Sequence, residues 1–93
     1  MTNEVLKNEL QEIMNGLKNL QSDFILLEAD TEKIKTLIKD QRYDLLTAHA
    51  VKTKELYDQL KQIEIKYNAI KRLVNEDFEE DKTEIETLIN WFR

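Results

Sequence analysis

Few side chains in this sequence are of a type that performs catalysis or binds metal. His49 is the only histidine, and the nearest acidic residue, Asp44, lies five positions away. A catalytic triad or a metal site needs a second group brought close to the imidazole, and no neighbour at helical spacing supplies one. The chain also has no cysteine, which excludes thiolate metal sites and disulfides. We therefore interpret His49 as a surface or loop residue, and expect no enzyme activity, metal, cofactor or small-molecule substrate.

Carboxylates are concentrated between positions 76 and 81, where five of the six residues are acidic. Three pairs are spaced four apart, as on one face of a helix: Glu76 with Glu80, Asp77 with Asp81, and Glu80 with Glu84. Di-iron bundles combine such glutamates with Glu-x-x-His motifs, which this sequence lacks. The cluster is most typical of a solvated linker, with a weakly bound cation or a basic partner as the alternatives.

Two runs of apolar residues at alternating spacings of four and three span most of the chain. The first consists of Leu6, Leu10, Ile13, Leu17, Leu20, Phe24, Leu27, Ile34 and Ile38, with Thr31 in the remaining position, and the second of Leu56, Leu60, Ile63, Tyr67, Ile70 and Val74. Each is a heptad seam, which is typical of a helix that buries a narrow stripe against another helix. We predict helices over about 3–40 and about 50–75.

The two seams fit each other when the chain folds back near position 47. This fold pairs Leu20 with Val74, Phe24 with Ile70, Leu27 with Tyr67, Thr31 with Ile63, Ile34 with Leu60, and Ile38 with Leu56. Each layer then joins an a position to a d position, as an antiparallel coiled coil requires. We predict an all-α fold built on an antiparallel helical hairpin that reverses between Asp44 and Thr53, with Leu45, Leu46 and Val51 at its closed end.

One long continuous helix, forming an oligomeric coiled coil, is the alternative. Ile38 and Leu56 are eighteen residues apart, which is about five helical turns, so they share a face without any reversal. The chain has no proline and only one glycine, Gly16. The first seam passes through Gly16 in phase, and we interpret this glycine as a soft point or a site of close approach.

The last part of the chain predicts a short third helix. Repulsion among the acidic residues should end the second helix near Asn75. Asp81 and Glu84 have the spacing of a capping box. They precede an apolar face made of Ile85, Leu88, Ile89 and Phe92. A helix over about 82–92 is too short to be stable alone, so it must dock on the hairpin or on a partner.

Composition and charge bound the class of protein. The 93 residues suffice for a single helical domain, with 41% apolar and 35% charged residues. The longest apolar run, 24–27, is far too short to cross a membrane, and we expect a soluble, cytoplasmic protein. The net charge of −5 disfavours direct nucleic-acid binding, unless the basic residues in the middle of the chain form a patch: Lys33, Lys35, Lys39, Arg42, Lys52 and Lys54.

Apolar surface that a two-helix seam does not use indicates a protein partner. The candidate partner-binding residues are Ile25, Leu26, Leu73, Trp91 and Phe92, together with the acidic residues Glu76, Asp77, Glu79, Glu80 and Asp81. The leading hypothesis is a helical protein-interaction module, acting as a scaffold, assembly adaptor or chaperone subunit, and forming a homodimer or joining a larger complex. The alternative is a small acidic inhibitor of viral or mobile-element type, whose carboxylates occupy a nucleic-acid-binding cleft in place of phosphates. A third possibility is a bundle module of a larger structural assembly.

Overall fold

A computed structural model describes residues 3–38, 43–74 and 76–93. These residues form three α-helices and two short 3-10 turns: α1 (Asn3–Ile38), α2 (Tyr43–Ile70), η1 (Lys71–Leu73), η2 (Glu76–Phe78) and α3 (Glu79–Trp91). No strand occurs in the described part of the chain. The predicted all-α hairpin with a short third helix is confirmed, and the single continuous helix is excluded.

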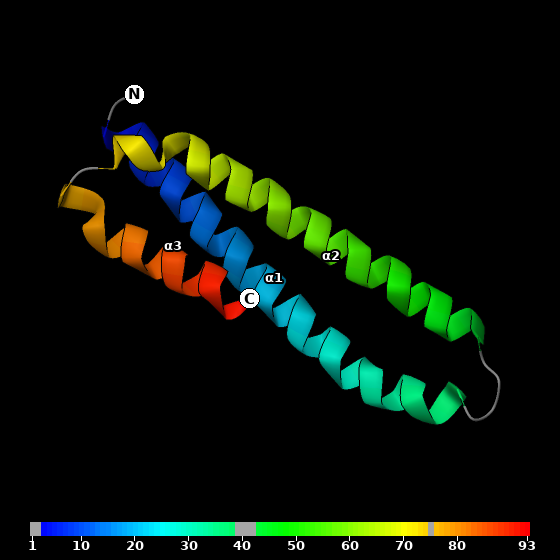
Figure 1. Cartoon of the computed structure of the whole chain (residues 1–93). Helices are drawn as coiled ribbons and strands as arrows, with labels where there is room; N and C mark the ends of the chain where they lie inside the picture. Colours follow the sequence, from blue (N-terminus) through cyan, green and yellow to red (C-terminus); the bar gives the residue numbers. More distant parts are fainter. Residues whose placement is uncertain (1–2, 39–42, 75) are drawn as a thin grey trace.

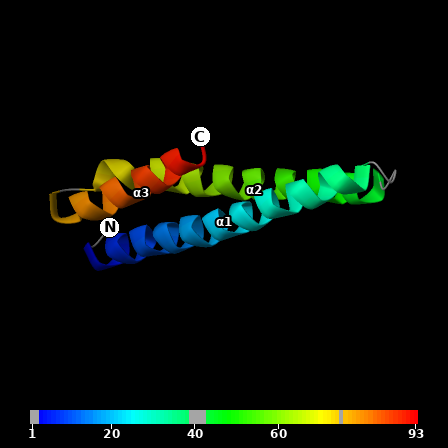
Figure 2. The same cartoon turned by 90° about the horizontal axis from the view of Figure 1, so that it is seen from below.

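The molecule is a narrow rod with a third helix along half of its length. Its extents are 56 × 17 × 17 Å, and the 36 residues of α1 account for the long axis at about 1.5 Å per residue. α1 and α2 run antiparallel over this length, and α3 lies beside the half that contains the N-terminus (Figure 1). The view from below shows the other half as two helices alone (Figure 2).

The expected pairing of α1 with α2 is wrong by two heptads. Thr31, expected opposite Ile63, hydrogen-bonds His49, fourteen residues earlier in the chain. Phe24 packs on Tyr57, with ring centroids 5.0 Å apart. Because fourteen residues are two full heptads, a positions still meet d positions, and the seam pattern alone cannot distinguish the two pairings.

The position of the reversal accounts for the shift. α2 begins at Tyr43, so the segment between Asp44 and Thr53 is helical and the predicted reversal there is wrong. The chain turns between Ile38 and Tyr43 instead, and the polar residues 39–42 that join the helices lie outside the described residues. Helix formation through 44–53 is physically reasonable, because this segment contains neither proline nor glycine.

The acidic run begins a helix rather than separating two. α2 ends at Ile70 and continues as η1, and α3 begins at Glu79 inside the run. The N-cap of α3 is Phe78, with no side-chain capping bond, so the capping box predicted at Asp81 and Glu84 is wrong. Glu79, Glu80 and Asp81 occupy the first turn, where negative charge interacts favourably with the helix dipole.

The buried core lies entirely in the three-helix half. Its members are Leu6, Leu10, Ile13, Met14, Leu17, Leu20, Phe24, Leu56, Leu60, Tyr67, Ile70, Phe78, Ile85 and Ile89. Gly16 is a close-approach site as predicted, because a Cβ atom built there would lie 3.2 Å from Cδ1 of Ile63. We call the three-helix half the base. The rest, residues 25–38 and 43–55, is the hairpin tip.

Polar contacts hold α3 in place along the base. Lys18 pairs with Glu84 at 3.0 Å, and Arg93 with Glu64 at 2.9 Å. Both pairs are largely exposed, so each contributes little stability. The Tyr67 hydroxyl, at the buried α2–α3 contact, donates a hydrogen bond to Glu86 at 3.3 Å. These contacts position α3, while its apolar face supplies most of the docking free energy.

The observed pairing is testable by distances between spin labels, since the chain has no native cysteine. We expect labels at Asp23→Cys and Asp58→Cys to lie close together, because the Phe24–Tyr57 contact puts these positions level. Labels at Asp23→Cys and Lys71→Cys should lie about 20 Å further apart along the axis, from thirteen additional residues of helical rise. The opposite order of the two distances, measured by double electron–electron resonance, is the signature of the two-heptad alternative.

Tyr67 should make stability fall at high pH. Burial, the nearby charge of Glu86 and the hydrogen bond to it raise the pKa of Tyr67 to about 12, whereas an unfolded tyrosine has a pKa of about 10. Between these values the unfolded chain loses the phenol proton first, so the free energy of unfolding decreases as pH rises. Denaturant unfolding at increasing pH should show this decline, and Tyr67→Phe should reduce it to the part contributed by Lys66, whose pKa is also raised. An identical alkaline decline in Tyr67→Phe contradicts the assignment.

Candidate functional site

The hairpin tip has a heptad seam without a complete core. No hydrophobic side chain that the structure describes in 25–36 or 43–55 is buried, although the seam continues through both segments. Seam residues Leu27, Ile34 and Leu45 are only half-buried. Two helices can shield one side of each such residue, and a third helix is missing here. The tip therefore presents apolar surface that no other described segment covers.

A groove of about 320 Å³ runs between the two helices of the tip. Its apolar lining comes from Leu27, Ile34, Leu45 and Ala48. Its polar lining comes from Asp30, Lys33, His49 and Lys52. An apolar floor with charges of both signs at the edges suits the apolar face of a helix, whose flanking charges then stay in water.

The groove opens on the face of the hairpin opposite α3. Asp30 lies three heptads after Glu9 on α1, and Lys52 lies two heptads before Lys66 on α2. Lys66 pairs with Glu9 at 3.2 Å, so these four positions mark one face. α3 approaches the other face, where Arg93 reaches Glu64. The chain's own third helix therefore leaves this face open along its whole length.

In the base, ion pairs between α1 and α2 cover this same face of the hairpin. Lys66 contacts Glu9 at 3.2 Å and Glu12 at 3.1 Å, and these hydrogen bonds raise the pKa of Lys66. Gly16 allows Ile63 to approach α1 closely one turn further along. At the corresponding positions of the tip, Asp30 and Lys52 both line the groove and form no ion pair with each other. The accessible apolar surface on this face is thus confined to the tip.

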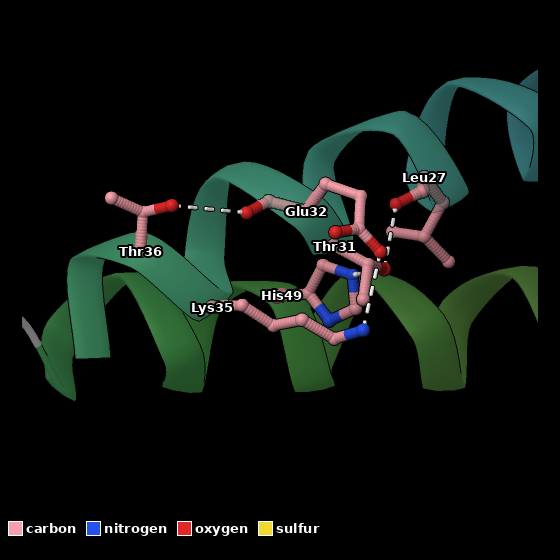
Figure 3. Close-up of polar contacts among 6 residues, drawn as sticks. All are labelled: Leu27, Thr31, Glu32, Lys35, Thr36 and His49. Atoms are coloured by element: carbon pink, nitrogen blue, oxygen red, sulfur yellow. Dashed lines mark hydrogen bonds and ion pairs between the residues drawn. The ribbon is translucent and has the colours of Figure 1, made fainter. Parts of the chain in front are cut away.

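A polar layer sits within the tip seam beside the groove. The Thr31 hydroxyl donates to the Leu27 carbonyl at 3.1 Å, and the same oxygen lies 3.1 Å from Nε2 of His49 (Figure 3). A hydroxyl has one proton, so His49 is the donor in the second bond. The interpretation of His49 as a surface or loop residue is wrong: it is a half-buried helical residue. Its role in the geometry is to pair with Thr31 across the seam.

Ile25 and Leu26, two candidate partner-binding residues, are exposed on different faces of α1. Leu26 is 65% exposed and precedes Asp30 and Lys33 by four and seven residues, which places it on the groove side. Ile25 is 53% exposed and lies one heptad after Lys18, on the side that α3 approaches. Only Leu26 extends the groove.

An aromatic cluster marks the point where α3 ends. Phe92 packs on Phe24 with centroids 5.3 Å apart, and Trp91 packs edge-on against Phe92 at 5.0 Å. Phe92 is half-buried against the core, while Trp91 stays 43% exposed. Adjacent residues of a helix point about 100° apart, which accounts for this difference. Leu73 is exposed at the opposite end of the base.

The candidate acidic residues lie together at the end of the base where α3 begins. Glu76, Asp77, Glu79 and Glu80 are exposed, and Asp81 is half-buried. Phe78, within the same run, is buried in the core. In the part of the chain that the structure describes, no three His, Cys, Asp or Glu side chains are arranged to hold a metal ion. No described helix is long and apolar enough to cross a bilayer.

Sequence reasoning does not identify several residues that form the groove and the core. The sequence analysis places Ile34 in the seam, and Leu45 and Ala48 in the reversal, so it does not foresee their joint groove. The available signal is that Leu46, His49 and Thr53 extend the second seam backward from Leu56 at spacings of three and four. Phe78 stands one heptad before Ile85, which is the corresponding signal for its burial.

The chain was compared with protein-family models, curated proteins and solved structures, and none of them matches it.

Proposed function

We propose that this chain is a non-enzymatic helical protein-interaction module whose binding surface is the hairpin tip. The observation that carries the proposal is the contrast between the two halves of one hairpin. The base buries fourteen apolar side chains, whereas the described residues of the tip bury none. A helical partner in the groove would cover apolar surface of the tip from the face opposite the one on which α3 covers the base.

The chemistry of the groove supports a protein partner. Burying apolar surface contributes about 25 cal/mol per Å², and Leu26, Leu27, Ile34 and Leu45 offer such surface along one line. Four of the eight lining residues are polar, but the exposed surface of the groove is mainly apolar, which favours an apolar occupant over a small polar ligand. A complementary apolar helix is the occupant that gains most from this surface.

The distribution of charge also favours the tip over the base as the binding surface. Residues 25–56 carry six basic and six acidic side chains, and the remainder carries eight basic and thirteen acidic ones, which gives the net charge of −5. A neutral surface docks on partners of either sign without strong repulsion. The acidic base keeps copies of the protein soluble and apart.

The acidic inhibitor remains the second candidate because four exposed carboxyl-bearing residues gather at one end of the base. Under that hypothesis the binding surface is the start of α3, and the tip plays no part. The same residues have a role within the fold, since Glu79 and Glu80 lie where the helix dipole favours negative charge. The interaction module therefore accounts for more of the structure.

The test is capture of partners by the tagged chain from a nuclease-treated lysate of its source organism, followed by direct binding of the recovered protein to purified variants. Leu26→Glu combined with Ala48→Glu places two charges on the groove face at exposed positions, and we expect at least ~10-fold weaker binding. Ile65→Glu is the matched control, because Ile65 is also an exposed apolar residue but lies on the base. It should bind like the unmodified chain.

A third variant separates the two candidate functions. Glu79→Gln with Glu80→Gln neutralises the cluster, and under the interaction-module hypothesis it leaves binding unchanged. Circular dichroism should show all variants to be equally helical, because the substituted side chains are exposed. Binding that is lost in the glutamine variant and retained in the groove variant refutes the module hypothesis in favour of the inhibitor.

A further inference from the structure

We propose that the partner of the tip groove is a second copy of this chain, docked tip to tip and antiparallel, so that two hairpin tips form a four-helix bundle. This inference rests on the proposed function, and it specifies the occupant. The two bases, each with its own α3, then point away from each other at opposite ends of the dimer.

The groove has the self-complementarity that a two-fold interface requires. In such an interface the same patch serves both copies, so it must present partners for its own groups. The apolar floor of one tip can cover that of the other. At the edges, Asp30 carries negative charge, while Lys33 and Lys52 carry positive charge. A surface with charges of a single sign would repel the same surface of a second copy. The groove edges carry both signs, so they do not.

The placement of net charge selects the tip-to-tip arrangement. The tip alone carries four basic and five acidic residues, and together with residues 39–42 it carries six of each, so two tips meet without strong net repulsion. The whole charge of −5 lies on the remainder. A parallel dimer would bring the two acidic bases side by side within a Debye length of about 8 Å, whereas the tip-to-tip dimer separates them by much of its length.

The size of the open face sets the expected affinity. Residues 26–38 of α1 extend over about 20 Å, and the molecule is 17 Å wide. A face of these dimensions is smaller than the interfaces of stable complexes and is typical of a weak, transient contact. We therefore expect a reversible dimer with a dissociation constant on the order of micromolar.

The first measurement is sedimentation equilibrium of the full chain between about 1 and 500 µM, a range that brackets micromolar affinity. The mass should rise from the monomer value of 11.1 kDa toward twice that value. Leu26→Glu should raise the dissociation constant at least ~10-fold, since it charges the groove face. Ile25→Glu is the matched control: it places the same charge on the adjacent residue, also exposed but on the side of α1 toward α3.

A second measurement locates the interface. A single spin label at Glu55→Cys, at the edge of the tip, should show a short distance between copies by double electron–electron resonance. A single label at Glu80→Cys, at the far end of the base, should show none within range, because both positions are exposed and only the first lies near the proposed contact.

The outcomes are distinguishable from those of the capture experiment. A monomer at all concentrations overturns the tip-to-tip dimer. If the groove variant still loses a captured partner, the interaction module stands and its partner is a different protein. A dimer that persists in Leu26→Glu, or one with close Glu80 labels, places self-association elsewhere and also overturns the inference.

Discussion

The register of α1 against α2 is the constraint on which the other features depend. It places Phe24 opposite the part of α2 that holds Tyr57, and Thr31 opposite His49. A slip by two heptads preserves the alternation of a and d positions. Hydrophobic packing alone therefore defines the register only weakly. The Thr31–His49 layer distinguishes the registers, because a slip would set Thr31 against Ile63 and leave its polar partner elsewhere. Buried or half-buried polar layers are the best-attested means of fixing register in coiled coils.

Once the register is set, the length of α3 determines which surface stays open. Its 13 residues extend about 20 Å, against about 54 Å for α1. α3 starts at the base end and runs toward the middle of the hairpin, where Phe92 reaches Phe24 (Figure 1). The third layer therefore ends near the point where the buried core ends. Because α3 is short, the tip is uncovered on the α3 side, and the groove on the opposite face lies where the seam continues beyond the contacts of Lys66 with Glu9 and Glu12.

The sequence predicts the helices and the hairpin well, because apolar periodicity reports which face of each helix is buried. It does not predict the register of α1 against α2. The seam of α1 fits the seam of α2 in two registers that differ by two heptads, and apolar periodicity does not distinguish them. The position of the chain reversal is also mispredicted, because residues 39–42 contain no glycine or proline that would mark a turn. The start of α3 was misplaced because the acidic run was judged by its mutual repulsion, which predicts a break. In a first turn the helix dipole offsets that repulsion, and Phe78 anchors the segment in the core.

The tip groove lay beyond sequence reasoning because it combines residues from two helices whose register was unknown. Leu26 could be recognised as surplus apolar surface, but its difference from the neighbouring Ile25 depends on which face α3 takes. With the register and α3 in place, apolar surface and neutral charge coincide at one end of the rod, and carboxylates at the other. This segregation underlies our proposal, because two acidic bases repel each other whereas the tip offers apolar surface without a large net charge. Under that proposal the rod associates through its tip and keeps its acidic base in solvent.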